Sequence, residues 1–482
     1  MSTASIAPFD APNRKTIAQG HPTDWQSPQP KEVYELVVIG GGPAGMKAAF
    51  TAATAGHIVA VVERNLIGGT CVNFGCTPSK SLIRAARAVF HAREGAKFGY
   101  TLDGAPRVDF AAVMTRVREM RAVTISSAAV SVVAGEGIDM FFGDARFVGA
   151  DTVEVDGQRL KFKKALIASG SGPAVPDIPG LAAADYLTNE TVFELSALPR
   201  RLVCLGGGAI NCELAQAFRR LGSEVDLVGS AERLLPAEAP AASEVLTARF
   251  AAEGVRLHLG VKATKVDGGR KRLTLSDGSE LEYDALLVAT GRKVNVDGMG
   301  LEAAGVNFSA SGVEADDHLR TANHAVYAAG DVASPEKHTH AAKAMAELIV
   351  ANALGGAVQR VSDLVIPRCI YTDPEVAQVG LTPQEAAERG MAIDTHWLEL
   401  ATIERARIDG ESDGFASLYT HEGTIVGATF VSAHAGESLP VLTLAVMQKM
   451  APADLAAVMH CYPTQVEAIQ RVAAQAGQDS RD

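Results

Sequence analysis

The chain has 482 residues, yet it has few aromatic residues, few cysteines and no long apolar run. Six cysteines are too few for disulfide bonds to stabilise a chain of this length. This excludes a disulfide-rich scaffold and fits a protein in a reducing compartment. No uninterrupted apolar run approaches the roughly 20 residues that a membrane-spanning helix needs. We therefore expect a cytoplasmic protein with no membrane segment.

Positive charge is also scarce, since 44 Lys and Arg residues stand against 56 Asp and Glu residues, a formal net charge of -12. This balance disfavours nucleic acid and anionic membrane surfaces as partners. The length is too great for one hydrophobic core, so about three domains are expected.

The N-terminal region lacks the patterns of a targeting segment. Its first twenty residues have neither the apolar block of a signal peptide nor the Arg-rich pattern of a transit peptide. Residues 1–32 carry five prolines without periodicity and contain no cysteine. This stretch predicts an extended N-terminal arm.

Two cysteines, Cys71 and Cys76, are separated by four residues (72–75) within GGTCVNFGCTPSK at 68–80. Glycines before and between them allow close backbone approach, and Pro78 and Ser79 are typical of an opening helix. Two structural thiols or half of a zinc site are the alternatives, but zinc needs a second ligand pair that the sequence does not show. The spacing favours a dithiol that cycles with a disulfide, provided that the Cα atoms come within about 7 Å.

The chain also contains an internal repeat with a period of 166 residues (206 − 40). An apolar strand at 34–39 leads into GGGPAG at 40–45, then a helix and a second strand. The same order returns with a strand at 201–205 and GGGAIN at 206–211. Two such turns in matching contexts predict two dinucleotide sites, with each pyrophosphate at a helix N-terminus.

The two repeats differ where the second strand ends. Glu63 lies 23 residues past Gly40 (63 − 40), where a carboxylate can accept from a ribose diol, whereas the equivalent position is Gly229 (63 + 166). Gly229 offers no acceptor for a 2′-hydroxyl, and Arg233 could supply a cation for a 2′-phosphate, so NADPH is favoured over NADH. Asn211 replaces the third glycine, which calls the tightness of the second site into question.

The dithiol motif and the repeats resemble the FAD-dependent pyridine nucleotide–disulfide oxidoreductases, such as dihydrolipoamide dehydrogenase, glutathione reductase and mercuric reductase. The resemblance extends from about Tyr34 onward and implies an α/β fold with two Rossmann-like domains, for FAD and NAD(P), and a C-terminal α+β dimerisation domain. The expected boundaries are 33–168 with 284–358 for the FAD-binding domain, 169–283 for the NAD(P)H-binding domain and 359–482 for the dimerisation domain. The segment HPTDW (21–25) resembles the leader of some mercuric-reductase-like proteins, and a flexible tail is the alternative.

The resemblance also assigns cofactor contacts, with FAD at the first repeat and NADPH at the second. The residues that it implies for FAD are Gly40, Gly42, Gly45, Glu63, Gly69, Thr70, Lys80, Ala145, Ser169, Gly170, Gly291, Arg292 and Asp331. Those that it implies for the pyridine nucleotide are Gly206, Gly208, Ile210, Glu213 and Arg233. The run at 338–340 (HTH) is expected under the flavin through backbone contacts, since no third metal ligand lies nearby.

The family's reaction runs from NADPH to flavin, then to the disulfide and the substrate. By position, Cys76 should face the flavin as a thiolate stabilised by a helix N-terminus, and Cys71 should be the thiol that meets the substrate. Lys80 and Glu213 fall where the family has a buried ion pair near flavin N5. Cys204, Cys212 and Cys369 lie in apolar surroundings and are expected to be inert.

The C-terminal motif departs from the disulfide-reducing members. They carry His-x-His-Pro-Thr and a following Glu, and the second His moves protons to the leaving thiol. Here residues 460–467 read HCYPTQVE, so Tyr462 replaces that base while Glu467 remains. A phenol with a pKa of about 10 is a poor base at neutral pH. Cys461 could be a packing residue or a relay for substrate.

Mercuric reductases also place a tyrosine at that position, but they end in a vicinal cysteine pair that the last residues here lack. The resemblance predicts a homodimer whose active site is shared between subunits, with Tyr462 projecting onto the partner's Cys71. The expected acceptor is a soft metal ion or a small electrophile. Dihydrolipoamide dehydrogenase or a related disulfide reductase is the alternative, and a slow flavin-linked sensor and an apo scaffold are the non-enzymatic ones.

Overall fold

The computed structural model describes residues 6–104 and 106–479, and the chain forms two compact units. Unit 1 contains the residues up to 176 together with 187–198 and 288–364. Unit 2 contains 177–186, 199–287 and the residues from 365 onward. Among the described residues, no helix has both the length and the apolar character needed to cross a membrane.

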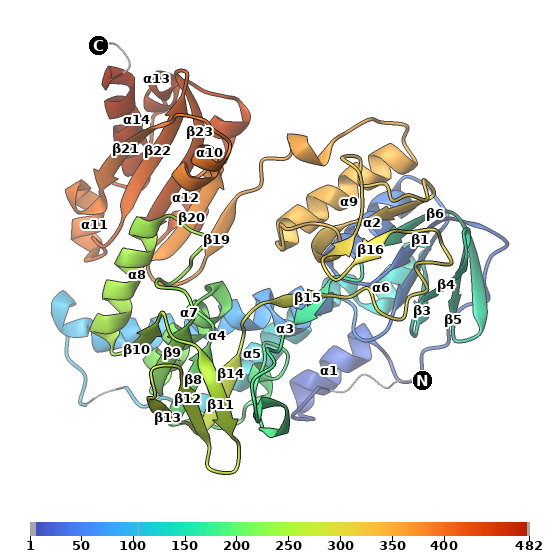
Figure 1. The fold of residues 1–482 in the computed structure, drawn as a ribbon, viewed down its shortest axis with the longest axis horizontal. Coiled ribbons are helices and arrows are strands. Elements are labelled where there is room, and N and C mark those ends of the chain that lie inside the picture. The colour runs from blue at the N-terminus through green and yellow to red at the C-terminus, as the bar shows by residue number, and fades with distance from the viewer. Residues whose placement is uncertain (1–5, 105, 480–482) are drawn as a thin grey trace. The chain divides into compact units, whose positions relative to one another are not determined.

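Unit 1 is built on a seven-stranded sheet in the order β3-β2-β1-β6-β5-β4, with β18 also paired to β6 (Figure 1). The strands are β1 (Tyr34–Ile39), β2 (Val59–Glu63), β3 (Asp139–Phe142), β4 (Arg146–Gly149), β5 (Thr152–Val155), β6 (Gln158–Ile167) and β18 (Val326–Ala328). β1, β2, β3, β6 and β18 pair in parallel, whereas β4 and β5 pair antiparallel. Because β18 begins 159 residues after β6 ends (326 − 167), a late segment completes this sheet.

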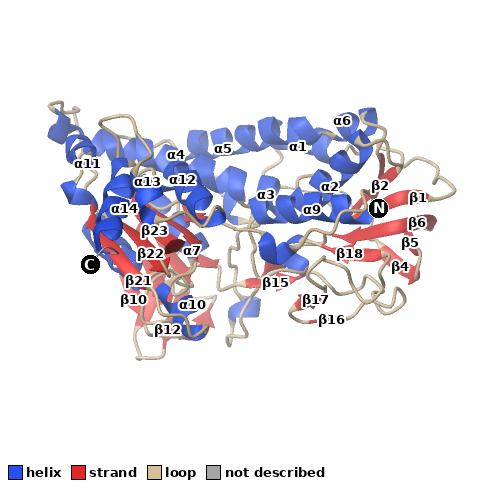
Figure 2. Cartoon of the chain, turned by 90° about the horizontal axis from the view of Figure 1, so that it is seen from above, coloured by secondary structure: helices blue, strands red, loops and turns tan. Residues whose placement is uncertain are grey.

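The helices of unit 1 include those that carry the dithiol motif. They are α1 (Ala11–Gly20), α2 (Pro43–Thr54), α3 (Gly69–Phe74), α4 (Cys76–Arg93), α5 (Phe110–Ile125), α6 (Val130–Gly135) and α9 (Thr339–Ala353). In Figure 2, α2 and α9 run side by side, and α5 lies beside α1 and α4. Short strand pairs complete the unit: β7 (Ser171–Pro173) with β15 (Arg292–Val294), and β16 (Phe308–Ser309) with β17 (Gly312–Val313).

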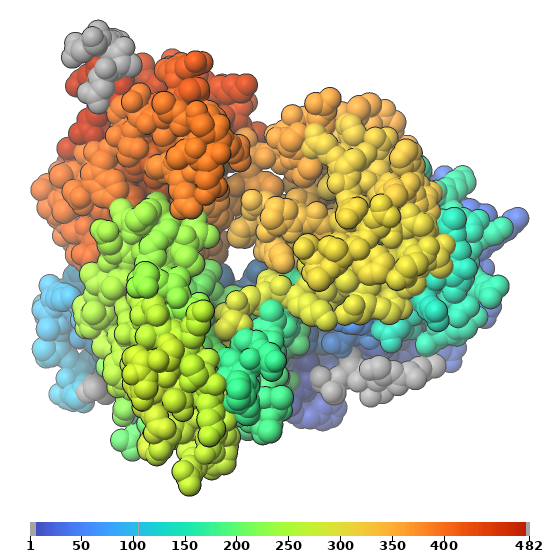
Figure 3. Space-filling model, in the orientation of Figure 1, coloured from blue at the N-terminus to red at the C-terminus, as the bar shows by residue number. Residues whose placement is uncertain are grey.

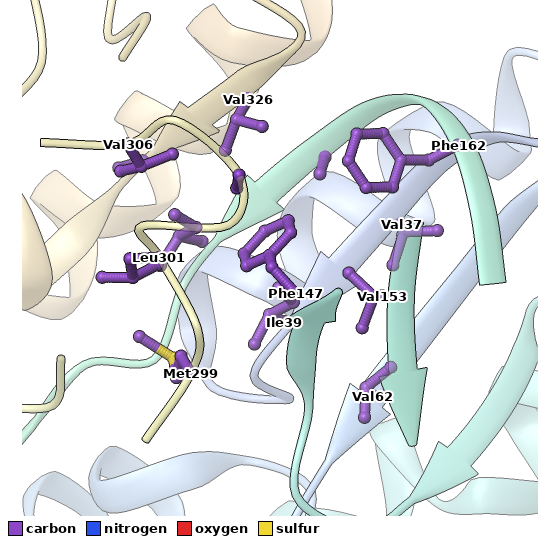
Figure 4. Close-up of a cluster of buried hydrophobic side chains, with 14 of the residues drawn as sticks. Val37, Ile39, Val62, Phe147, Val153, Phe162, Met299, Leu301, Val306 and Val326 are labelled. Carbon is purple, nitrogen blue, oxygen red and sulfur yellow. The ribbon is translucent and has the colours of Figure 1, made fainter. Parts of the chain in front are cut away.

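One face of this sheet carries a continuous apolar core (Figure 4). Val37, Ile39 and Val62 of the parallel strands pack with Phe147 and with side chains of the segment that follows β15. That segment is yellow in Figure 3 and forms part of the surface of unit 1 on the face shown. Apolar residues at alternate strand positions therefore hold a segment that is distant in sequence against the sheet.

Unit 2 contains a second parallel arrangement, with strand order β10-β9-β8-β14. Its elements are β8 (Arg201–Leu205), α7 (Ala209–Leu221), β9 (Glu224–Gly229), α8 (Pro240–Glu253), β10 (Arg256–Leu259) and β14 (Ala285–Val288). A separate sheet joins β11 (Ala263–Asp267), β12 (Arg272–Leu275) and β13 (Glu280–Glu282). Strand, glycine turn, helix and strand thus follow one another as in unit 1, which is the predicted repeat.

The C-terminal part of unit 2 is an antiparallel sheet in the order β19-β20-β23-β22-β21. Its elements are β19 (Arg368–Ile370), β20 (Glu375–Gly380), α10 (Pro383–Glu388), β21 (Asp394–Glu399), α11 (Glu404–Asp409), β22 (Phe415–His421), β23 (Thr424–Ser432), α12 (Ala435–Met447), α13 (Pro452–Ala456) and α14 (Glu467–Asp479). The predicted α/β fold with two Rossmann-like parts and an α+β C-terminal part is confirmed. The three predicted domain boundaries stay predictions, because the structure groups the second and third domains into one unit.

The prediction of an extended arm over 1–32 needs correction, because its centre is the helix α1. Asp10 caps this helix by accepting a hydrogen bond from the backbone N–H of Asn13, and a proline lies in its first turn. Proline is well tolerated there, since the first N–H groups of a helix have no intrahelical partner. Ile17 and Gly20 are buried, so the helix is packed rather than exposed on all sides.

Candidate active site

The first glycine turn brings α2 close to its sheet. Gly40 has φ +108°, and a Cβ there would lie 2.4 Å from the carbonyl oxygen of Ala168. A Cβ at Gly45 would lie 1.9 Å from the carbonyl oxygen of Gly40, so only glycine allows this approach. Gly42 precedes Pro43 and caps α2 without a side chain. The amides at this helix end can therefore face a diphosphate, as a dinucleotide site requires.

Glu63 ends β2 beside this turn and is only 8% exposed. Its Oε2 accepts the N–H of Gly41 at 2.6 Å, and its Oε1 accepts the N–H of Asn65 at 2.7 Å. Burial raises the pKa of the Glu63 carboxyl, while these amides oppose that shift. The backbone N–H of Gly143 binds the Glu63 carbonyl, and Ala145 packs on the adjacent core. A carboxylate held in this way fits a ribose diol, so the cradle suits the FAD that the family uses.

Asp331 lies in the short 3-10 turn Gly330–Val332 just after β18. Its Oδ2 accepts a hydrogen bond from the Ser171 hydroxyl and another from Arg292 Nε, the second at 3.1 Å. Arg292 also donates to the carbonyl of Ser171 at 2.9 Å. The structure thus gives Arg292 the role of holding Asp331, and its predicted direct contact with FAD stays a prediction.

Two segments of unit 1, residues 169–174 around β7 and residues 291–295 around β15, are joined by hydrogen bonds. The Ser169 hydroxyl donates to the carbonyl of Asn295 at 2.7 Å, and the N–H of Asn295 donates to the carbonyl of Gly170 at 3.0 Å. The carbonyl of Gly291 accepts the N–H of Ala174 at 3.0 Å. These hydrogen bonds hold the two segments together. The predicted FAD contacts of Ser169, Gly170 and Gly291 stay predictions.

The dithiol motif folds as α3 and α4, with Gly75 between them. Gly69 has φ +56°, and a Cβ there would lie 2.8 Å from Gly42 Cα, so this helix packs directly on the nucleotide turn. Thr70 follows it in α3. Cys71 is half-buried on α3, and the exposed Cys76 is the first residue of α4, at the helix N-terminus that the sequence predicted.

Both cysteines are thiols in this structure, and their side chains hydrogen-bond to each other. That hydrogen bond, followed by burial and by the charge of Cys76, raises the pKa of Cys71, while Thr339 and Lys343 oppose the shift. This direction agrees with the prediction that Cys76 carries the thiolate, and that assignment stays a prediction. In the described part of the chain, no group of three or more His, Cys, Asp or Glu is placed to hold a metal ion.

Thr339 is a neighbour of the thiols that sequence reasoning missed. Its Oγ1 lies 3.5 Å from Cys76 Sγ, although 263 residues separate the two in sequence. The run at 338–340 was interpreted only through its backbone. The sequence did offer one signal for Thr339, because the family resemblance placed residues 338–340 under the flavin. Thr339 is the first residue of α9.

Lys80 and Glu213 belong to different units. Lys80 is half-buried on α4, one turn after Cys76. Glu213 is buried on α7, and its Oε1 accepts the N–H of Tyr371 at 2.9 Å. Their predicted ion pair therefore stays a prediction.

Two cysteines of unit 2 have the surroundings of inert core residues. Cys204 and Cys212 are fully buried, and burial raises the pKa of both thiols. A buried thiol of raised pKa is a poor nucleophile, in agreement with the expectation for these two positions.

The second glycine turn is held by a side chain in place of its third glycine. Gly206 has φ +120°, and Gly208 caps α7, whose first turns carry Ile210. The buried Asn211 donates through Nδ2 to the carbonyls of Leu205 at 2.7 Å and Gly206 at 2.9 Å. These bonds tie α7 to the end of β8, so the replacement does not loosen the turn.

Gly229 ends β9, and a Cβ there would lie 3.6 Å from Gly207 Cα, so this position faces the glycine turn as Glu63 does in unit 1. Arg233 makes backbone contacts in this structure, and its predicted contact with a 2′-phosphate stays a prediction. Its Nη1 donates to the carbonyl of Glu238 and its Nη2 to that of Pro236, each at 2.7 Å. The guanidinium thus holds the loop before α8, and the argument for NADPH depends on Gly229 alone.

The C-terminal motif presents Tyr462 at the surface, where it is 67% exposed. Its hydroxyl donates to a carboxylate oxygen of Glu404 at the start of α11, and this bond raises the pKa of Tyr462. Glu467 begins α14, and one of its carboxylate oxygens is buried without a hydrogen-bond partner among the described residues. Cys461 is exposed. The hydrogen bond between Tyr462 and Glu404 could not be predicted from the C-terminal motif, because the two residues are 58 positions apart in sequence.

Comparisons with known proteins agree with this arrangement. Residues 34–346 match the family model "Pyridine nucleotide-disulphide oxidoreductase", and residues 366–473 match its dimerisation domain, which supports a homodimer. A mercuric reductase of Lysinibacillus sphaericus is 36% identical over 448 residues, covering 91% of this chain and 82% of the relative. A dihydrolipoyl dehydrogenase of Chlamydia muridarum is 32% identical over 446 residues, covering 90% and 95% respectively.

Among solved structures, the HOCl-induced flavoprotein disulfide reductase RclA from Escherichia coli superimposes with a TM-score of 0.82 at 25% identity. The superposition covers 92% of this chain and 99% of that one. Relatives of this family use FAD together with a pyridine nucleotide. The chain therefore belongs to the class I pyridine nucleotide–disulfide oxidoreductase family and is an oxidoreductase.

Proposed function

We propose that this enzyme passes electrons from NADPH through FAD to the Cys71–Cys76 disulfide and on to a soft metal ion or small electrophile, in the manner of a mercuric reductase. The observation that carries this proposal is Tyr462, an exposed phenol at the position where disulfide-reducing members have a basic histidine. Its raised pKa keeps the hydroxyl protonated at neutral pH, so it cannot act there as a general base.

The geometry supports separate tasks for the two thiols. The Gly40 turn and Glu63 would hold FAD, which would supply transfer of an electron pair from the coenzyme to the disulfide. The S–S bond between Cys71 and Cys76 would break when the two sulfurs accept that pair. Cys76, at the N-terminus of α4, holds the thiolate, and Cys71 holds the proton. A soft cation binds both sulfurs as thiolates and so releases that proton. The net reaction oxidises one NADPH and reduces the acceptor by two electrons.

An acceptor screen tests the proposal. The enzyme is reduced with NADPH without oxygen, and Hg(II) in excess thiol, lipoamide, glutathione disulfide or a quinone is added. We expect Hg(II) to restore the oxidised flavin spectrum fastest, because binding to thiolates needs no acid–base residue. Reoxidation by lipoamide at the same rate as by Hg(II) would contradict the proposal.

The second candidate function is dihydrolipoamide dehydrogenase, and the specific observation that favours it is the retained Glu467. In disulfide-reducing members this carboxylate accompanies the basic histidine. Here it lies at the start of α14 without that histidine, so we rank this function second. Rapid reoxidation by lipoamide in the screen would reverse the order.

Coenzyme choice follows from Gly229 and gives a second prediction. We expect a higher kcat/KM with NADPH than with NADH, because no carboxylate at this position accepts from the 2′-hydroxyl or repels a 2′-phosphate. Gly229→Glu should shift the preference toward NADH by about tenfold to a hundredfold, the value of one charge-assisted hydrogen bond. The measurement is steady-state kinetics with both coenzymes.

Gly229→Ala is the matched control, since it adds a Cβ near Leu259 and Gly207 without a carboxylate. It should leave the ratio of the two kcat/KM values within about threefold of that of the unmodified enzyme. Equal efficiency with both coenzymes in the unmodified enzyme would refute the argument.

A further inference from the structure

The N-terminal helix α1 packs onto the segment that carries the dithiol. Ile6 and Ile17 form a buried cluster with Leu66, and Phe74 at the end of α3 packs against it. The backbone N–H of Ile67 donates to the carbonyl of Gly20 at 3.2 Å. The residues before and within α3 are therefore covered by a part of the chain that lies outside the matched family region, which begins at residue 34.

A buried arginine connects α1 to the dithiol loop. Arg121, on α5, is 2% exposed, and its Nη2 donates to the side-chain oxygen of Asn13 on α1. Its Nη1 donates to the backbone carbonyl of Asn73 at 2.9 Å. Burial, followed by the charge of Arg118, lowers the pKa of Arg121 to about 10, so the guanidinium stays charged at neutral pH. A buried charge with two such acceptors is costly to displace.

Asn73 transmits this restraint to the cysteines. It lies between Cys71 and Cys76 and is fully buried. Its Nδ2 donates to the carbonyls of Ile67 and Gly69, each at 3.0 Å, so the side chain fixes the segment that leads into α3. The same residue is thus held through its side chain from within the loop and through its carbonyl by Arg121.

We propose that Arg121, oriented by Asn13 of the N-terminal helix, is a positioning residue that holds α3 so that Cys71 stays within bonding reach of Cys76. This inference rests on the proposed cycling of the two thiols. Reduction adds two electrons and breaks the S–S bond, and reoxidation must return the sulfurs to about 2 Å from each other. A loop restrained at Asn73 keeps the open thiols close, which favours reclosure of the disulfide.

Arg118 supplies a matched control on the same helix. It is 4% exposed, and its Nε donates to Asp10 at 2.6 Å. It therefore joins α5 to the start of α1 as Arg121 does, but its hydrogen bond goes to Asp10, and within the described residues it makes none to Asn73. Arg118→Met and Arg121→Met each remove one buried guanidinium, and the Arg121 variant alone cuts the link to the dithiol loop.

The test is the midpoint potential of the dithiol in the FAD-loaded, full-length enzyme, measured by equilibration with glutathione buffers and thiol counting. For Arg121→Met we expect a disulfide about tenfold less favoured, a shift of about 30 mV to less negative potential for a two-electron couple. The long-wavelength charge-transfer absorbance of the two-electron-reduced enzyme should weaken. Arg118→Met should change the equilibrium by less than about twofold.

Asn13→Leu is the second variant, and it decides the question if Arg121→Met does not fold. It removes the acceptor that orients Arg121 and should shift the potential in the same direction. An unchanged potential in Asn13→Leu, or equal shifts in the Arg118 and Arg121 variants, would overturn the inference. If Cys71 and Cys76 of the unmodified enzyme show no redox change, both the proposed function and the inference about Arg121 fail.

Discussion

Replacing either Cys71 or Cys76 by serine should abolish NADPH-dependent reduction of Hg(II) while the protein keeps its FAD. The reason is that no S–S bond can form in either variant, so the electron pair cannot reach the acceptor through sulfur. The residues that cradle FAD, such as Gly42 and Glu63, are untouched by both changes. Steady-state turnover and the flavin absorbance of the purified protein measure the two effects.

The same variants separate the roles of the two thiols. Only Cys71→Ser, which keeps the thiolate at the N-terminus of α4, should show long-wavelength charge-transfer absorbance. Cys204→Ala is the control, because this thiol is fully buried in unit 2 and should be silent. Charge-transfer absorbance in Cys76→Ser instead would reverse the assignment, and full turnover in either serine variant would exclude the dithiol mechanism.

Tyr462→His should raise turnover with lipoamide by about 10²–10⁴-fold, the usual contribution of a general acid–base residue. Histidine has a pKa of about 6.5, so its neutral form accepts protons at pH 7, whereas the hydrogen bond to Glu404 holds the pKa of Tyr462 above its usual range. Turnover with Hg(II) should not rise, because that acceptor needs no proton shuttle. Steady-state assays with both acceptors give the comparison.

Tyr462→Phe is the matched control, since it removes the hydroxyl that binds Glu404 without adding a base. Its lipoamide turnover should stay as low as that of the unmodified enzyme. The contradicting result is an unmodified enzyme that already reduces lipoamide as fast as Tyr462→His does. In that case Tyr462 does not limit lipoamide turnover, and the proposed acceptor is wrong.

The sequence predicted the parts of the site that depend on local patterns. A turn of glycines between a strand and a helix has few structural solutions, so Gly40 and Gly206 identified both nucleotide turns. Cys76 was placed at a helix start because the residues after it open a helix. Each of these predictions needed only neighbouring residues.

The contacts that orient the site could not be predicted, because they join residues far apart in sequence. Asn13 and Arg121 are separated by 108 residues, and an arginine on a helix is usually a solvated surface residue. Arg233 looked like an available cation, yet the loop before α8 occupies its donors. The helix α1 was missed because the prolines of residues 1–32 were interpreted as breaks, whereas Pro12 lies in the first turn of the helix.

The pairing of β18 with β6 has a consequence for biosynthesis. The 158 residues between these strands (326 − 167 − 1) take roughly 8–30 s to translate at roughly 5–20 residues per second. During this time residues 165–167 of β6 have no strand on the side that β18 later takes, although β5 already pairs with residues 158–161. The strands β8 to β14 leave the ribosome before β18 and can fold first. An exposed edge strand is a site for aggregation. The sheet of unit 1 is therefore completed only after the strands β8 to β14 have been made, and residues 165–167 of β6 are the part of its edge that stays open until then.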